Sequence, residues 1–224
     1  MKKKFLGFLL CGAVIVSLTG CGNDKKNSEE NGEAKSGSKT ETKKTYSIKE
    51  NETFYFKVNG KTFKAGDKVT DLSKADLKLK PKYEDESIPK NRYLMSKPVI
   101  DKDEKEVFDI IPINLTDDKI VAKEATIAGI EIGDYNTSKV SEETLALDFE
   151  VVGGLKLGSS YEDMIKVLGE DYYKTEFEAK ESPVKMPAYT VYKYSSGYKG
   201  YEFIIDDSGK VSEIKWNNYS YDEK

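Results

Sequence analysis

Two similar segments, separated by 92 residues, constrain the fold of this 224-residue chain more than any other feature. The first reads FKAGDKVTDLSKADLKL over Phe63–Leu79, and the second reads LKLGSSYEDMIKVLGED over Leu155–Asp171. Both open on an apolar residue, a lysine and another apolar residue, followed by Gly66 or Gly158, and both continue into a helical pattern. Self-similarity at a fixed spacing is typical of a duplicated structural unit. We therefore expect two copies of one unit.

The second segment predicts a helix over 159–168, because its apolar residues recur at i, i+3, i+4 and i+7. These apolar residues are Tyr161, Met164, Ile165 and Leu168. Ser159 and Glu162 have the spacing of a capping box, and Gly169 predicts the C-terminal end. The first segment predicts a weaker helix over 67–79 with Asp67 as its cap, since Asp76 stands where the second helix has a leucine.

Extended stretches surround both predicted helices. A strand precedes each helix, over 53–58 and 147–154. Two stretches joined by an acidic turn follow each helix, over 99–111 and 204–216, which is the pattern of a β-hairpin. The predicted fold class is α+β, with two tandem repeats over 49–146 and 147–224. In each repeat we expect a short helix to pack against its own antiparallel sheet.

A duplicated unit of this kind, a short helix and a multistranded antiparallel sheet, resembles the β-lactamase inhibitory protein fold. The KLGSSYEDMIKVLGED stretch is similar to the helix of the small outer-membrane assembly lipoproteins, which share half of that fold. Over about residues 52–221 the chain resembles secreted lipoproteins of low-GC Gram-positive bacteria. The resemblance implies the two-repeat architecture and carries no catalytic residue. The disulfides of the inhibitory proteins have no counterpart here.

The N-terminal residues have the pattern of a signal peptide. Three lysines at 2–4 precede an uncharged apolar stretch that is short for a membrane span. Leu-Thr-Gly-Cys at 18–21 resembles a bacterial lipobox, which implies cleavage after residue 20 and lipidation of Cys21. The alternative is an uncleaved signal anchor. Residues 21–48 predict a lipidated, disordered tether, because they contain too few apolar residues to form a core. The expected location is extracytoplasmic, anchored to the cell membrane by lipid at Cys21.

Composition argues against several classes of function. The chain has no histidine, and Cys11 and Cys21 are its two cysteines, so thiol catalysis and a structural zinc site are not expected. The net charge of −4 argues against nucleic acid as a partner. Acidic clusters at 84–86 and 101–103 could hold calcium, but solvated surface charge is the favoured interpretation. We therefore expect no enzyme activity, no catalytic residue, no metal and no cofactor.

Tyrosines near the C-terminus are the candidate partner-binding residues. They are Tyr189, Tyr192, Tyr194 and Tyr198. Alternation along a strand places Tyr192 and Tyr194 on one face and Tyr189 on the other. The helix can cover only one face of the strand, so the tyrosines of the other face lie outside the core. Tyrosines outside the core favour recognition, although they could equally shield a sheet. The expected function is a protein-interaction module for an unknown extracytoplasmic protein, contacting the membrane through its lipid anchor only. The alternative is a small-ligand or peptide-binding lipoprotein.

Overall fold

The computed structural model describes residues 54–136, 139–180, 186–196 and 199–219. All of them belong to one compact unit, residues 42–224. The predicted signal peptide, Cys21 and the tether lie outside the described residues. Among the residues that are described, no helix is long and apolar enough to cross a membrane.

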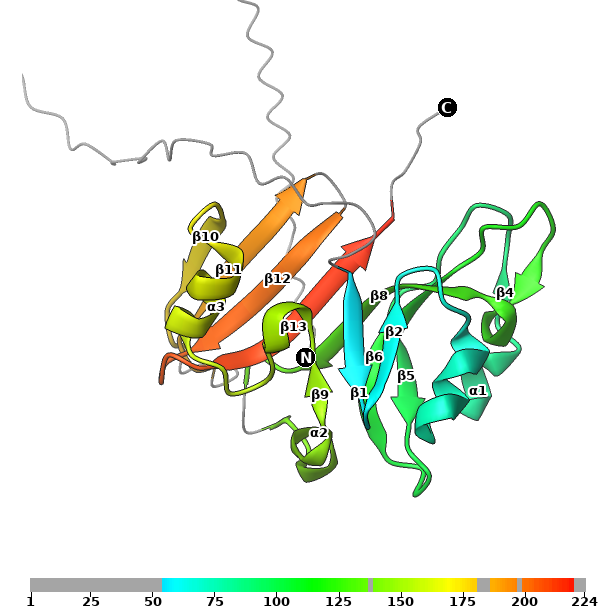
Figure 1. Cartoon of the computed structure of the whole chain (residues 1–224), viewed down its shortest axis with the longest axis horizontal. Coiled ribbons are helices and arrows are strands. Elements are labelled where there is room, and N and C mark those ends of the chain that lie inside the picture. The colour runs from blue at the N-terminus through cyan, green and yellow to red at the C-terminus, as the bar shows by residue number, and fades with distance from the viewer. Residues whose placement is uncertain (1–53, 137–138, 181–185, 197–198, 220–224) are drawn as a thin grey trace, which may run out of the picture. The chain divides into compact units, whose positions relative to one another are not determined.

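The main element is an eight-stranded sheet in which all neighbouring strands run antiparallel (Figure 1). Its strands, in spatial order, are β10 (Tyr173–Phe177), β11 (Tyr189–Ser196), β12 (Lys199–Asp206), β13 (Val211–Asn218), β8 (Thr126–Gly133), β6 (Glu106–Ile113), β5 (Lys97–Ile100) and β3 (Lys78–Leu79). Each half of the sheet follows chain order, and β13 pairs with β8 at its centre. The α+β class is confirmed. The expectation of a separate sheet for each helix is wrong, because the last strands of the two halves join into one sheet.

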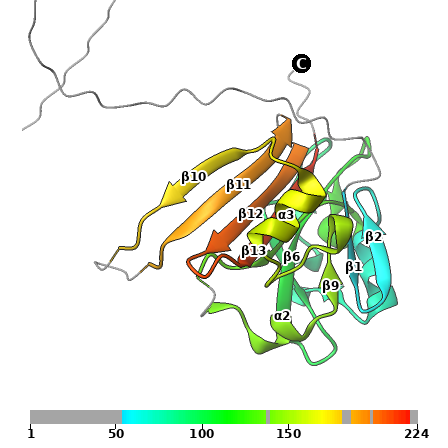
Figure 2. The same ribbon diagram turned by 60° about the vertical axis from the view of Figure 1, so that its left-hand side comes forward.

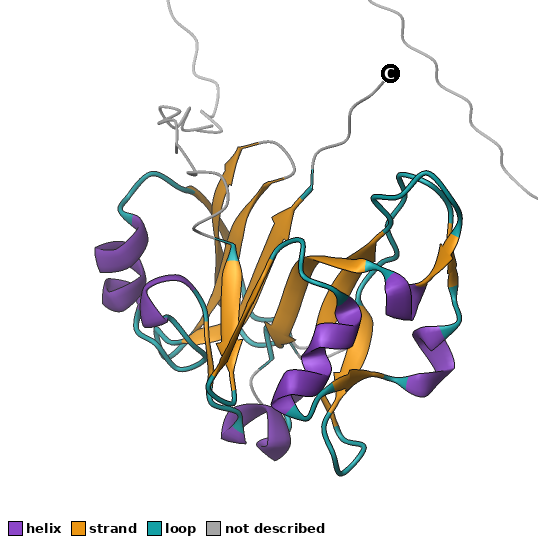
Figure 3. Ribbon diagram, turned by 45° about the vertical axis from the view of Figure 1, so that its right-hand side comes forward, coloured by secondary structure: helices purple, strands orange, loops and turns teal. Residues whose placement is uncertain are grey.

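Smaller elements complete the fold, and Figure 3 shows that strands dominate and helices are short. A three-stranded sheet has the order β2 (Lys61–Lys64), β1 (Tyr55–Val58), β9 (Phe149–Glu150), and β4 (Ser87–Ile88) pairs with β7 (Ile120–Val121). The helices that the structure describes in full are η1 (Val69–Ala75), α1 (Pro81–Glu84), η2 (Ala122–Glu124), α2 (Glu142–Ala146), η4 (Val152–Gly154) and α3 (Tyr161–Leu168). The two strands expected before the helices, β1 and β9, pair with each other. The strand expected over 147–154 is shorter than predicted, because β9 covers Phe149–Glu150 and Val152–Gly154 form the 3₁₀ helix η4.

The core lies between the eight-stranded sheet and the elements that cross one of its faces, β1, β2, β9 and α3 (Figure 1). We call this covered side the inner face and the opposite side the outer face. Phe54 stacks on Tyr201 with ring centroids 5.5 Å apart, and Phe56 lies 6.5 Å from Trp216. Trp216 is fully buried. Aromatic pairs in these geometries add to the stabilisation that burial already provides.

The two helices begin with the same hydrogen bonds. The amide of Gly66 donates to the carbonyl of Ile127 in β8 at 2.8 Å, and the amide of Gly158 donates to the carbonyl of Val211 in β13 at 2.8 Å. One turn later, the amides of Val69 and Tyr161 donate to the carbonyls of Ala125 and Gly209, just before the two strands, at 3.0 and 3.2 Å. Both glycines have positive φ, 98° and 82°, which a side chain would strain. Each helix is thereby fixed to one of the two central strands.

The predicted helix limits need correction. The first helix is a 3₁₀ helix over Val69–Ala75 and not a helix over 67–79, because Lys78 and Leu79 already pair in the sheet. The second helix is capped by Ser160 and not Ser159, since the Ser159 hydroxyl accepts from the Lys156 amide in the preceding turn at 3.0 Å. The helix ends at Gly169, as predicted.

Both expected hairpins form, and their turns are built alike. Asp101 donates its amide to the Lys105 carbonyl at 3.0 Å, and Asp206 donates to the Lys210 carbonyl at 2.9 Å. In each turn the aspartate carboxylate accepts the amide of that same lysine, at 2.9 and 3.0 Å. Their places in the sheet differ, because one turn joins β5 to β6 and the other joins β12 to the central strand β13. The two turns are therefore alike in their hydrogen bonds, but the hairpins that they close do not occupy equivalent places in the sheet.

Candidate functional site: the outer face of the sheet

The four predicted tyrosines separate into three groups. Tyr192 and Tyr194 face α3 and are 7% and 0% exposed, so the structure does not place them on an accessible surface. The Tyr194 hydroxyl donates to the Gly169 carbonyl at 2.9 Å, and the Tyr192 ring lies 5.1 Å from that of Tyr161. Both are core residues because α3 and the chain after it cover this end of the inner face (Figure 2). Tyr189 is half-buried on the outer face, and Tyr198 lies outside the described residues.

A row of directly opposed residues crosses the outer face through seven strands. From β5 to β10 the row is Pro98, Asp109, Glu131, Lys215, Glu202, Lys193 and Tyr173. We call it the charged row. Directly opposed side chains on one face of an antiparallel sheet are close enough to interact. From Glu131 to Lys193 the charges alternate in sign, and the row contains the ion pairs Glu131–Lys215 and Glu202–Lys193; we call this part the ladder.

Lys215 is the centre of the ladder. Its ammonium group lies 3.0 Å from the carboxylate of Glu131 and 2.6 Å from that of Glu213, its neighbour on β13. Burial lowers the pKa of Lys215, but the hydrogen bonds and charges of the two glutamates outweigh it and raise that pKa. The Ser96 hydroxyl also donates to Glu131, at 3.1 Å, from the loop before β5.

Two carboxyl groups beside this lysine hold their protons unusually well. Glu213 is 3% exposed, and its burial is the main cause that raises its pKa to about 7. The charge of Glu131 also raises this pKa, whereas Lys215 lowers it. Asp109 lies directly opposite Glu131. Burial, together with the charges of Glu131 and Glu106, raises the pKa of Asp109 to about 6. The carboxyl groups of Asp109, Glu131 and Glu213 outnumber Lys215, so the centre of the outer face becomes net negative as Asp109 and Glu213 ionise with rising pH.

Three aromatic rings cluster at one end of the outer face. Tyr189 stacks on Phe177 with ring centroids 4.6 Å apart, and the Tyr135 ring lies 5.3 Å from Tyr189. We call these three residues the aromatic cluster. The ammonium group of Lys139 lies 5.2 Å from the centroid of the Tyr135 ring. Burial raises the pKa of Tyr189, with the charge of Tyr135 adding to it. The sequence interpretation missed Phe177 and Tyr135, although the alternation within 173–177 could have identified Phe177.

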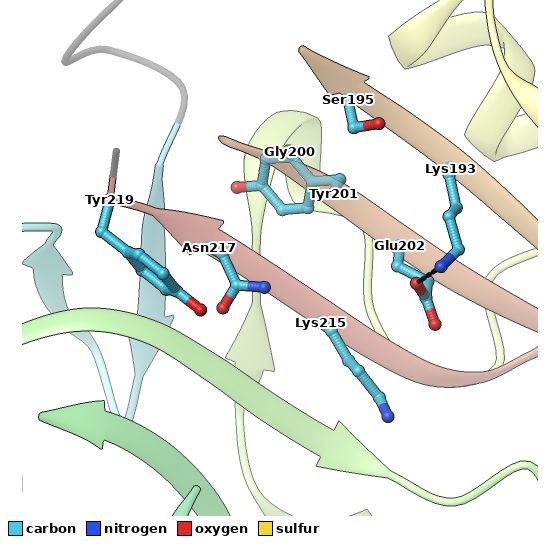
Figure 4. Close-up of a pocket in the computed structure, with 8 residues that line it drawn as sticks. All are labelled: Lys193, Ser195, Gly200, Tyr201, Glu202, Lys215, Asn217 and Tyr219. Atoms are coloured by element: carbon cyan, nitrogen blue, oxygen red, sulfur yellow. Dashed lines mark ion pairs between the residues drawn. The ribbon is translucent and has the colours of Figure 1, made fainter. Parts of the chain in front are cut away.

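Two shallow hollows lie on the outer face and share Lys193, Glu202 and Lys215. The larger, of about 310 Å³, lies beside the aromatic cluster. The smaller, of about 200 Å³, extends along the face toward Asn217 and Tyr219. Figure 4 shows this second hollow, with the Lys193–Glu202 ion pair of 2.7 Å drawn as a dashed line. The side-chain oxygen of Asn217 is buried and accepts no hydrogen bond among the described residues.

The acidic clusters of the sequence have structural roles. Asp85 forms an ion pair of 2.8 Å with Lys123, which ties the end of α1 to η2. Asp101 accepts the amides of Asp103 and Lys105 at 2.8 and 2.9 Å, which closes the hairpin turn described above. Within the described ranges, no group of three or more histidine, cysteine, aspartate or glutamate residues has the arrangement of a metal site.

Fold and site together define an α+β protein with one covered sheet face and one face that carries charges and aromatic rings. Comparison with family models, with curated proteins and with solved structures finds no match for this chain.

Proposed function

We propose that this protein is a membrane-anchored extracytoplasmic lipoprotein that acts as a protein-interaction module, and that its outer sheet face binds the partner. The observation that carries the proposal is the aromatic cluster beside the charged row on one side of the sheet. Aromatic residues supply most of the binding energy in many interfaces, and surrounding charges select the partner and its orientation. The carboxyl groups around Lys215 outnumber the lysine, which favours a partner with a basic patch.

Anchoring through Cys21 rests on the lipobox-like residues 18–21. A diacylglyceryl group supplies the two chains that stable membrane attachment requires. Cys21→Ala should leave the chain uncleaved or released from the membrane, as measured by fractionation and acyl-chain labelling. Normal processing and full membrane retention of this variant would contradict the lipoprotein proposal.

We also propose that the fold is a tandem duplication. The shared hydrogen bonds at Gly66 and Gly158 support it, together with the strand order, in which each half is a meander ending on a central strand. Superposing β3, β5, β6 and β8 on β10, β11, β12 and β13 tests it. The two glycines should then coincide, and a mismatch of a full helical turn would rule the duplication out.

The partner can be identified by photo-crosslinking on intact cells. A photoreactive amino acid in place of Lys193, which is exposed in the middle of the outer face, should attach the partner covalently. The matched control replaces Lys166, which is exposed on α3 on the other side of the sheet. Attachment from position 193 and not from position 166 is the expected result. Equal attachment from both positions, or attachment from position 166 alone, would contradict an outer-face site.

The second candidate function, binding of a small ligand or a peptide, is supported by the larger hollow. Its volume of about 310 Å³ reaches the lower end of the range for small-molecule sites, and the aromatic cluster forms its wall. The buried oxygen of Asn217 lines the smaller, adjoining hollow and is an acceptor for a ligand that spans both hollows. A ligand bound here should raise the melting temperature, and Phe177→Ala should remove that rise. A ligand-induced rise that persists in the Phe177 variant would place the ligand elsewhere.

A further inference from the structure

The strand β10 forms one outer edge of the eight-stranded sheet (Figure 2). It pairs with β11 on one side, and no strand of the described part pairs with its other side. All five of its residues are exposed, including Tyr173 at 46% and Phe177 at 41%. An exposed edge with aromatic residues presents unpaired peptide groups to any other strand, and natural proteins usually protect such edges. Such an edge is a candidate for pairing with another chain.

The sequence of β10 is symmetric in chemical character about its central residue. It reads Tyr-Lys-Thr-Glu-Phe, with aromatic residues at both ends and opposite charges on the two sides of Thr175. We propose that two copies of this chain associate through β10, strand against antiparallel strand, around a two-fold axis at Thr175. A two-fold interface needs a surface that complements itself, and this strand has one. The proposal concerns self-association and is separate from the binding of a partner by the outer face.

The charges select the register. With the axis at Thr175, Lys174 of each copy lies opposite Glu176 of the other, so two attractive pairs form. An axis at Lys174 would oppose two lysines, and an axis at Glu176 would oppose two glutamates, both of which are destabilising. An axis between two residues would join the outer face of one copy to the inner face of the other, because a slip of one residue reverses all side chains.

The aromatic residues fit the same register. Tyr173 of one copy lies opposite Phe177 of the other, and both point to the outer face, as their pairing with Lys193 and Tyr189 shows. Opposed aromatic side chains are favourable cross-strand pairs. Within one copy Lys174 and Glu176 form an ion pair of 2.5 Å, so both side chains lie on the same side of the strand. In the dimer each of them would pair with the opposite charge of the other copy. The dimer would carry one continuous sheet, with the two aromatic clusters near its axis.

Disulfide trapping of the full-length chain in its membrane tests the axis directly. In an antiparallel pair, opposed Cα atoms are about 4.5–5.5 Å apart, which is within the range of a disulfide. Thr175→Cys should therefore give covalent dimers on mild oxidation. Tyr173→Cys is the matched control, because residues 173 of the two copies would be about 14 Å apart along the strands. Cys11 and Cys21 are the same in both variants, so they give the same background.

The charge pairs are tested in the Thr175→Cys background. Glu176→Lys or Lys174→Glu alone turns both attractive pairs into repulsive ones, which should lower the association about five- to thirtyfold and the trapped dimer accordingly. Coexpression of the two variants should restore trapping as a heterodimer, because all four charges are then opposed by the other sign. Both changes lie on an exposed strand and leave the core intact, which thermal melting checks.

Three results would overturn the proposal. Thr175→Cys could trap no more dimer than Tyr173→Cys, the charge variants could trap as well as their parent, or the cysteine could attach a different protein instead of a second copy. The first two results do not depend on the outer-face partner, since the trapping they measure is between copies of the chain. Attachment from position 193 would still report on the proposed function in each case.

Discussion

The two faces of the eight-stranded sheet use the same residue types for different purposes. On β11, Tyr192 and Tyr194 are enclosed by α3 and the chain after it, while Tyr189, on the same strand, stacks with Phe177 on the other face. On the inner face these tyrosines contribute apolar area to a core, and the Tyr194 hydroxyl donates to the Gly169 carbonyl. On the outer face it borders ion pairs and a hollow. The difference shows that the covering elements, and not the number of tyrosines, decide which residues can meet a partner.

The largest expected effect is on the inner face. Tyr194→Ala should lower the free energy of unfolding by about 3–5 kcal/mol, because it empties a fully buried site and removes the hydrogen bond to Gly169. Urea unfolding measures this loss. Tyr194→Phe is the matched control and should lose about 1 kcal/mol, the contribution of the hydrogen bond alone. A loss below about 1 kcal/mol for the alanine variant would contradict a core role.

The buried carboxylate on the outer face gives an effect that depends on pH. Because the folded pKa of Glu213 is about 7 and that of an exposed glutamate is about 4.5, the folded chain binds more protons between these values. Stability should therefore fall by about 2–3 kcal/mol as pH rises from 5 to 8. Glu213→Gln should reduce this dependence and be more stable than the parent at pH 8. Parallel pH profiles for the parent and the variant would show that Glu213 is ionised in the folded state.

The helix starts should respond equally to the same change. Gly66→Ala and Gly158→Ala each place a side chain at positive φ, where neither meets a neighbouring atom within 4 Å, so the cost is backbone strain of about 1–2 kcal/mol. Thermal melting of the two single variants compares the halves of the fold. Losses that differ by more than about 1 kcal/mol would weaken the duplication proposal, because equivalent positions should carry equal strain.

The smallest effect on stability is expected from the ion pairs of the outer face. Lys193→Ala removes a partly exposed ion pair with Glu202 and should lower stability by about 0.2–1 kcal/mol. High salt should reduce the difference between parent and variant, since such pairs are screened. A loss of several kcal/mol would show that the charged row supports the fold, which would remove the contrast between the two faces.

Local patterns predicted the elements of this fold better than their assembly. The helix at 161–168, its end at Gly169 and both hairpins follow from side-chain periodicity and turn residues, which are local properties. The joining of β8 to β13 does not, because strand pairing depends on contacts distant in sequence. A bulge next to Ile205 also shifts Val211 onto the inner face, against simple alternation. The type of these elements was therefore predictable, whereas the end of the first helix and the sheet topology were not.

The candidate site could be predicted only in part for the same reason. Alternation correctly separated Tyr189 from Tyr192 and Tyr194, but it could not show which face the helix would cover. Tyr135 reaches Tyr189 from a loop 54 residues away, which no periodicity reports. The charged row is likewise a product of register across seven strands. Such a site exists only once the strands are paired.

The most direct test of the outer-face proposal measures partner attachment and stability in the same variants. With the photoreactive residue at position 193, Tyr189→Ala and Phe177→Ala should each lower partner attachment about thirtyfold, which corresponds to about 2 kcal/mol of affinity. Their melting temperatures should stay within a few degrees of the parent, because both rings lie at the surface of the sheet. Undiminished attachment in folded variants, or loss of attachment only together with loss of the thermal transition, would contradict the account.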